Sequence, residues 1–186
     1  TLPASVTSIE NSTFYKCSSL ASITIPESVT SIGESAFYGC TSLTDVYYSA
    51  SKANWEEITI GTSNEPLLNA TIHYPPIASG TCGHPDNEGG ESSVTWSLSE
   101  DGVLTISGTG AMYDWCMMPD SRFAPWNMDR EKIRSVVIES GVTSVGNQAF
   151  LDYDNLESVT IPDGVESIGS YAFAFDEKLS SISLPM

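Results

Sequence analysis

Only two histidines are available for acid–base or metal chemistry. His73 falls in a predicted strand, and His84 falls in a segment rich in glycine and proline. A Ser-His-Asp hydrolytic arrangement could use either histidine, since serine and acidic residues are abundant. The repeat described below already accounts for most of the serines. We therefore expect no enzyme and assign no catalytic residue.

Metal-binding motifs are fragmentary in this chain. Cys82-Gly-His84 could begin a zinc site, but zinc needs about four ligands with paired spacing, and Cys116 is the only other cysteine outside the repeat. Residues 86–88 and 152–155 resemble pieces of calcium loops but lack the full pattern. We interpret these stretches as turns and exposed acidic loops, and we expect no metal and no cofactor.

Two sets of residues could contact a macromolecule. The first is a polar ladder on the outward side of the strands predicted below, which consists of Ser22, Thr24, Asp45, Tyr47, Ser158, Thr160, Ser181 and Ser183. The second is segment 113–126, which is rich in the aromatic and methionine side chains that dominate interface hot spots. The candidate ligand-binding residues are Thr24, Asp45, Tyr47, Ser158, Thr160, Trp115, Met117 and Phe123.

Each set also has a structural interpretation. The ladder is equally typical of a solvated sheet. The aromatic segment could instead pack over the open end of the second array, above all Trp126, which immediately precedes a half coil of the repeat.

A 23-residue repeat organises both ends of the chain. Segment 25–37 matches segment 161–173, and further units begin at Leu2, Ile138 and Leu184. Five apolar columns recur at this spacing. They are Val6, Val29, Val142 and Val165; Ile9, Ile32, Val145 and Ile168; Phe14, Phe37, Phe150 and Phe173; Leu20, Leu43, Leu156 and Leu179; and Ile23, Val46, Val159 and Ile182. A sixth column, which holds Cys17, Cys40, Tyr153 and Asp176, loses its apolar character in the second array.

The spacing within one unit predicts one solenoid coil. Phe14, Cys17 and Leu20 lie three residues apart, as in a helical or 3-10 turn with one face inward, while Ile23 and Ile25 alternate as in a short strand. One coil buries too few side chains to offset the entropy of ordering it, so coils must stack into a parallel ladder. Arrays of two coils are marginal, and we expect extra structure at the inner end of each array.

The insert between the arrays predicts this extra structure. Ser51 caps a predicted short helix, and strands at 58–60 and 70–74 complete a modified coil that closes a first domain at residues 1–74. Residues 75–93 form a predicted linker. Alternating apolar residues around Asp101-Gly102 predict a β-hairpin in a capping module at 94–132, and the second array follows at 133–186. Whether Cys82 and Cys116 pair stays open.

Composition narrows the partners. Twenty-four acidic and seven basic residues give a net charge of −17, which repels nucleic acid and anionic membranes. No apolar run is long enough to insert into a membrane. The units that begin at Leu2 and Leu184 match the start of a coil, so we expect exposed repeat ends that self-stack end to end.

These repeat units resemble the BspA-like leucine-rich repeat family, closely over residues 1–47 and 133–186. Two companion segments of the family look similar to stretches in the insert, one ending at Tyr74 and one running from Gly80 to Trp126. The resemblance implies a leucine-rich repeat solenoid, mostly β with short helical or 3-10 turns, in two short arrays of 23-residue coils joined by a β-hairpin-containing insert.

The resemblance also implies a secreted or cell-surface location in bacteria and adhesion to host or microbial macromolecules. We therefore expect a non-enzymatic, acidic recognition module that binds a surface protein or glycan through its extended repeat face. The alternative is a purely structural spacer that holds another part of a larger surface protein away from the cell.

Overall fold

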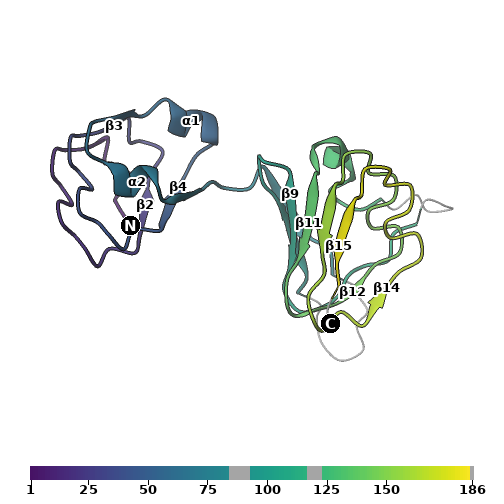
Figure 1. Ribbon diagram of the computed structural model, residues 1–186. Helices are drawn as coiled ribbons and strands as arrows, with labels where there is room; N and C mark the ends of the chain where they lie inside the picture. Colours follow the sequence, from purple (N-terminus) through teal and green to yellow (C-terminus); the bar gives the residue numbers. More distant parts are fainter. Residues whose placement is uncertain (84–92, 117–122, 185–186) are drawn as a thin grey trace. The chain divides into compact units, whose positions relative to one another are not determined.

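The computed structural model describes residues 1–83, 93–116 and 123–184 and shows a solenoid-like fold of short parallel strands with few short helices (Figure 1). The chain divides into two compact units, unit 1 from Thr1 to Pro75 and unit 2 from Pro76 to Met186. None of the helices in the described ranges is long and apolar enough to span a bilayer.

Unit 1 contains two three-stranded parallel sheets. One sheet has the order β1-β3-β5, from Ser8–Ile9, Ser31–Ile32 and Thr59–Ile60. The other has the order β2-β4-β6, from Ser22–Ile25, Asp45–Tyr48 and Thr71–His73. Each coil contributes one strand to each sheet, so the side chains between the sheets form a continuous core.

In the regular coils, neighbouring parallel strands pair residues that are 23 positions apart, as the sequence repeat predicts. Ser22 pairs with Asp45 across β2 and β4, and Ser8 pairs with Ser31 across β1 and β3. Because side chains alternate along a strand, this register stacks Ile23 on Val46 inside the core. The Phe column stacks in the same way, with the Phe14 and Phe37 ring centroids 5.1 Å apart.

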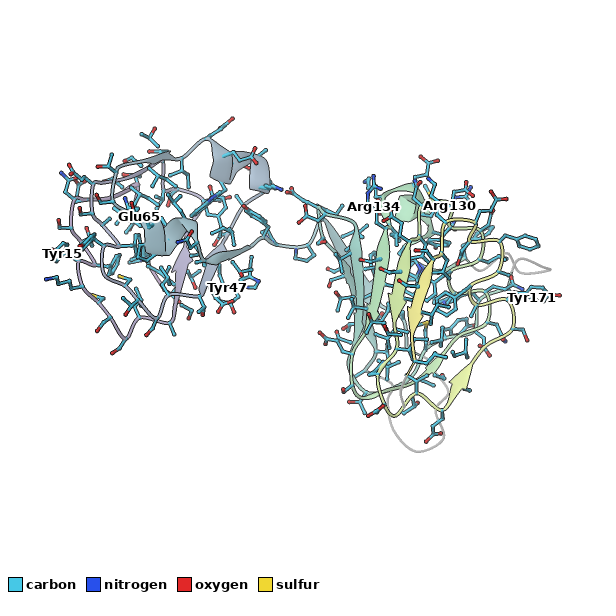
Figure 2. All side chains as sticks on the ribbon, in the orientation of Figure 1. Tyr15, Tyr47, Glu65, Arg130, Arg134 and Tyr171 are labelled. Atoms are coloured by element: carbon cyan, nitrogen blue, oxygen red, sulfur yellow. The ribbon has the colours of Figure 1, made fainter. Side chains whose placement is uncertain are left out.

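The segment between Phe and Leu forms consecutive hydrogen-bonded turns where a helical or 3-10 turn was predicted. The amide of Cys17 donates to the Phe14 carbonyl and that of Leu20 to the Cys17 carbonyl, as the three-residue spacing requires. Lys16, however, has a positive φ of 59°, which breaks any helix. These turns carry Tyr15 on the outside of unit 1 (Figure 2).

The third coil closes unit 1. Helix α1, Lys52–Glu56, starts at the predicted N-cap Ser51, and helix α2, Glu65–Leu68, follows β5. Asn64, which is buried, precedes α2 and accepts a hydrogen bond from the Phe37 amide at 2.9 Å. In the preceding coil the Phe14 amide donates to the Ala36 carbonyl instead. The Asn64 side chain therefore replaces a backbone acceptor of the repeat.

Unit 2 combines a hairpin with the second array. Its six-stranded sheet has the order β15-β13-β11-β9-β8-β7, from Ser181–Ser183, Ser158–Thr160, Ser135–Ile138, Val103–Ser107, Thr95–Leu98 and Ala78–Thr81. The first four strands in that order are parallel, and β9, β8 and β7 are antiparallel. A second parallel sheet, β10-β12-β14, contains Gly110–Ala111, Val142–Val145 and Ser167–Ile168.

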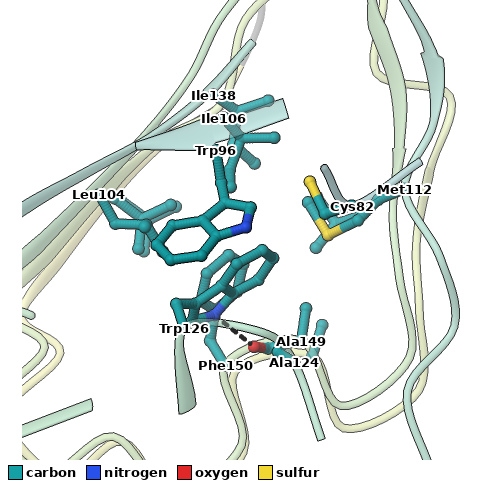
Figure 3. Close-up of a cluster of buried hydrophobic side chains, with 14 of the residues drawn as sticks. Cys82, Trp96, Leu104, Ile106, Met112, Ala124, Trp126, Ile138, Ala149 and Phe150 are labelled. Atoms are coloured by element: carbon teal, nitrogen blue, oxygen red, sulfur yellow. Dashed lines mark hydrogen bonds between the residues drawn. The ribbon is translucent and has the colours of Figure 1, made fainter. Parts of the chain in front are cut away.

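Trp126 begins the aromatic column of unit 2. It is fully buried before the 3-10 helix η1, Asn127–Lys132, and it stacks on Phe150 with centroids 5.5 Å apart. Its indole N–H donates to the Ala149 carbonyl at 3.1 Å (Figure 3). Trp96 from β8 meets Trp126 edge to face. The hairpin and the loop before η1 thus supply the first layer of the core on which the coils stack.

The segment between the two predicted domains contains structure. Residues 75–93 were expected as a linker. Strand β7 lies within this segment, and it adds an antiparallel strand to the hairpin by pairing with β8. Cys82 follows β7 and is buried beside Met112, where desolvation raises the pKa of its thiol to about 12 (Figure 3). Cys116 is exposed, and the four cysteines, all described, form no disulfide.

Candidate binding site

The outer face of the β2-β4-β6 sheet presents two rows of side chains. The register aligns Ser22, Asp45 and Thr71 in one row and Thr24, Tyr47 and His73 in the next. The sheet therefore brings together three of the predicted site residues, Thr24, Asp45 and Tyr47. It adds His73, which the sequence placed in a strand without a role.

The side chains of the two rows contact one another. The Tyr47 and His73 rings are stacked, with centroids 4.7 Å apart and planes 16° apart. His73 Nε2 lies 2.7 Å from Asp45 Oδ1, and the Thr44 hydroxyl donates to Asp45 Oδ2 at 2.7 Å. Tyr47 nevertheless keeps 47% of its surface exposed. We call Thr24, Asp45, Tyr47 and His73 the unit 1 patch.

Two neighbouring side chains fix the Asp45 carboxylate in its ionised form, in which it accepts hydrogen bonds. Hydrogen bonds from the Thr44 hydroxyl and then from the His73 ring lower the pKa of its carboxyl group below the usual value. An ionised carboxylate accepts hydrogen bonds from hydroxyl or amide groups of a ligand. The patch thus combines an exposed ring with a fixed acceptor.

His73 escaped the sequence argument because the closing coil is irregular. The step from β4 to β6 is 26 residues, since Asp45 pairs with Thr71, so His73 lies outside the 23-residue columns. The sequence did offer one signal: His73 lies two residues after Thr71 in the same strand, so both side chains are on the same face of the sheet.

The outer face of unit 2 is different in chemistry. Its rows run across β9, β11, β13 and β15, and they consist of Val103, Ser135, Ser158 and Ser181, and of Thr105, Val137, Thr160 and Ser183. Ser158 and Thr160 are therefore neighbours on this face, as the sequence predicted, but both rows contain only Ser, Thr and Val. This surface offers hydroxyl groups without the ring and carboxylate of the unit 1 patch.

The aromatic candidates lie on another part of unit 2. Trp115 and Phe123 line the same small pocket, next to Arg130 and Asp152. Trp115 packs against Tyr113 and meets Trp126 edge to face, so part of the segment covers the core, while Phe123 is 50% exposed. Met117 lies outside the described residues.

The fragments that suggested metals make other contacts. Arg130 lies 3.7 Å from the Asp152 carboxylate, and the Asn155 amide group donates to the Glu131 carbonyl. Within residues 1–83, 93–116 and 123–184, no three His, Cys, Asp or Glu side chains gather as a metal site. His84 and residues 86–88 lie outside these ranges.

A protein-family model agrees with the repeat. The model for the BspA type leucine rich repeat region matches residues 1–64 and 128–186, in six copies. The match therefore includes β5 and most of η1 as well as the regular coils. No curated protein matches the chain.

Two solved structures are similar to the chain, one over part of it and the other over nearly all of it. One is a leucine-rich repeat protein from Eubacterium ventriosum ATCC 27560, with 40% identity and a TM-score of 0.46 over 59% of this chain and 26% of that one. The other is a leucine rich cell surface protein from Faecalibacterium prausnitzii A2-165, with 20% identity and a TM-score of 0.32 over 97% of this chain and 58% of that one. The chain thus spans about a quarter and about three fifths of their lengths.

Proposed function

Because this chain belongs to the BspA type leucine-rich repeat family, we propose that it is a non-enzymatic recognition module that binds a surface protein or glycan through the outer face of unit 1. The observation that carries the proposal is the unit 1 patch, where an exposed ring stack adjoins an ionised carboxylate. Repeat proteins of this architecture commonly bind through an extended outer surface.

The arrangement of the patch leaves one face of the Tyr47 ring accessible. His73 covers the opposite face, and the neighbour on the open side is Thr24, a much shorter side chain. An apolar face of a sugar ring or an aliphatic side chain can pack on the open face of the Tyr47 ring, above Thr24, while Asp45 accepts a hydrogen bond from the same ligand. The stack and the His73–Asp45 contact hold both groups in place before binding, which reduces the entropy cost of association.

The test is binding of the whole chain to an array of matrix proteins and glycans at physiological salt. Truncation of a central aromatic anchor costs about 2 kcal/mol or more, so Tyr47→Ala should weaken a specific hit more than tenfold. Thr105→Ala, at an outward position of the same kind in unit 2, serves as the matched control and should leave the hit unchanged. Binding that is insensitive to Tyr47→Ala and His73→Ala would place recognition elsewhere.

A structural spacer is the second candidate, favoured by the outer face of unit 2. Its rows of Ser, Thr and Val are those of a solvated sheet, and the net charge of −17 keeps such a surface soluble and separate from its neighbours. If the chain binds none of the matrix proteins and glycans tested, while its far-UV circular dichroism is that of a folded protein, the spacer is favoured.

The proposed location is outside the bacterial cell, on its surface or secreted, as the family resemblance implies. Protease shaving of intact producing cells tests it: loss of the protein from intact cells, with a cytoplasmic marker retained, supports a surface location. Protection in intact cells, together with absence from the medium, would contradict the proposed location.

A further inference from the structure

The turns of the last coil carry two large aromatic side chains on the outside of unit 2. Tyr171 exposes 62% of its surface and Phe175 exposes 70%. Figure 2 shows Tyr171 projecting away from these turns. Scattered exposed apolar residues are ordinary on protein surfaces, so the meaning of this pair depends on the backbone that carries it and on the groups around it.

The backbone at these two positions is unfavourable for large side chains. Tyr171 has a φ of 58° and Phe175 a φ of 65°, in the left-handed region where a bulky side chain crowds the backbone. The other coils fill the same two columns with smaller or polar residues, namely Ser12, Ser35 and Gln148 in the first and Lys16, Gly39 and Asp152 in the second. Packing of the coil therefore gives no reason for a ring at either position.

Backbone hydrogen bonds place the two rings next to the preceding coil. The Gln148 amide donates at 3.0 Å to the carbonyl of the residue before Tyr171, and the Asp152 amide donates at 3.0 Å to that of the residue before Phe175. Gln148 and Asp152 line one pocket together with the half-exposed Phe123. Both columns thus open onto one face of unit 2. We call Phe123, Asp152, Tyr171 and Phe175 the unit 2 turn face.

Carboxylates surround the rings of the turn face. Segments 148–156 and 171–179, which the structure describes in full, have one basic residue, Lys178, and four acidic residues, Asp152, Asp154, Asp176 and Glu177. Burial raises the pKa of Asp176, and repulsion from Asp152 and Asp154 adds to the shift, so carboxylates of two neighbouring coils lie close together. Arg130 lies 3.7 Å from Asp152 and offsets only part of this charge.

Rings next to carboxylates match a cationic partner. A guanidinium or ammonium group is attracted to the face of an aromatic ring and forms charge-assisted hydrogen bonds with a carboxylate. An apolar partner would bury the carboxylates without a counter-charge, which is costly. An anionic glycan would be repelled, and a neutral glycan could use the rings but would leave the repulsion between the carboxylates unrelieved.

We propose that the unit 2 turn face docks an arginine-rich segment of a protein partner. Guanidinium groups of the segment stack on Tyr171 and Phe175 and pair with the neighbouring Asp152. Arginine suits this face better than lysine, because its planar group stacks on a ring and can give two parallel hydrogen bonds to a carboxylate. The net charge of −17 steers such a segment toward the chain.

This inference goes beyond the proposed function, since the turn face shares no residue with the unit 1 patch. Changes at Tyr47 and His73 test the patch, and changes at Asp152, Tyr171 and Phe175 test the turn face. The failure of one surface therefore leaves the other standing.

The test is fluorescence anisotropy of a labelled peptide of alternating glycine and arginine, titrated with the whole chain. Peptides with lysine or serine in place of arginine are compared with it. The arginine peptide should bind more tightly than the lysine peptide of equal charge, and the serine peptide should not bind. Phe175→Asn and Tyr171→Asn should each weaken the arginine peptide about fivefold and reduce its advantage over lysine. Asp152→Asn should weaken both basic peptides.

Two control variants separate the turn face from general charge and general aromatic surface. Glu139→Gln removes an exposed carboxylate elsewhere on unit 2, and Tyr38→Asn removes an exposed ring of unit 1. Both should keep the preference for arginine and change binding much less. Equal losses in Glu139→Gln and Asp152→Asn would indicate attraction to net charge alone and overturn the proposal. Equal binding of the arginine and lysine peptides, or no binding of either, would also overturn it.

The variants also separate binding from folding. Asparagine adopts the left-handed conformation more readily than tyrosine or phenylalanine, so the urea midpoints of Phe175→Asn and Tyr171→Asn should equal or exceed that of the parent. Asp152→Asn keeps every ring and the shape of the side chain, so its loss of binding supports the proposal independently of the ring variants. Binding of the arginine peptide that survives in all three variants would place the peptide elsewhere.

Discussion

Asp176 should make unit 2 less stable as the pH rises. It occupies the column that holds Cys17, Cys40 and Tyr153 in the other coils. One carboxylate oxygen accepts from the Tyr153 amide at 2.8 Å, while the other is buried without a partner among the described residues. Burial raises the pKa of Asp176 to about 6, and repulsion from nearby aspartates adds to the shift, although the Tyr153 amide lowers it.

The sign follows from proton linkage. The pKa of the folded state lies above the ordinary value of 3.8, so between about pH 4 and pH 6 the folded chain binds more protons than the unfolded chain. The penalty is absent below this window and fully present above it. A shift of about two pH units corresponds to about 3 kcal/mol for a fully desolvated group. Because Asp176 is only half-buried, solvent screening reduces our expectation to about 1 kcal/mol.

Asp176→Asn should therefore raise the free energy of unfolding by about 1 kcal/mol near neutral pH and bring no gain near pH 4. Asparagine keeps an oxygen acceptor for the Tyr153 amide and removes the charge. Urea unfolding followed by tryptophan fluorescence reports mainly on unit 2, since three of the four tryptophans lie there. Glu177→Gln, an exposed neighbour with the same charge change, is the control. An equal gain at both pH values, or in the control, would refute the argument and indicate general relief of the −17 charge.

Three further predictions concern the repeat. Asn64→Ala should destabilise unit 1 by about 3 kcal/mol in urea unfolding, because it leaves the Phe37 amide buried without an acceptor; an effect as small as that of the exposed Asn69→Ala would contradict this. Lys16→Gly should stabilise the chain by up to about 1 kcal/mol in the same assay, since it relieves a positive φ, and an unchanged midpoint would refute it. We propose that the apolar side chains exposed in the last coil, Ile168, Ile182 and Leu184, cause association at high concentration, and sedimentation of a clean monomer would count against this proposal.

The inward-facing residues made the repeat predictable. Five columns keep an apolar residue in every coil, so the 23-residue spacing alone gives the parallel register that pairs Ser135 with Ser158 and Ser158 with Ser181. The Ser51 cap of α1 was also predictable, since its signal is local. The features that the sequence did not predict depend on contacts between segments that are not spaced by 23 residues. Asn64 replaces a backbone acceptor of the next coil, and nothing in its neighbourhood in the sequence indicates that role.

The candidate sites were predictable only in part, for a related reason. Thr24, Asp45 and Tyr47 were found because they share the outward positions of a regular strand. His73 belongs to a coil with a 26-residue step, and Tyr153 sits in a core column, where a polar end group looks like a packing residue. That the Tyr153 hydroxyl has no hydrogen-bond partner among the described residues emerges only when the surrounding atoms are placed.

The solenoid separates the residues that determine the fold from those that can determine binding. Stacking constrains the inward columns, because each coil must match its neighbours, while the outward positions remain free to vary without loss of stability. In the unit 1 patch, Thr24, Asp45 and Tyr47 occupy such outward positions, and only His73 comes from the closing coil, where the period changes. In a repeat protein of this kind, the outward positions and the departures from the period are therefore the places to look for function, since packing already explains the inward columns.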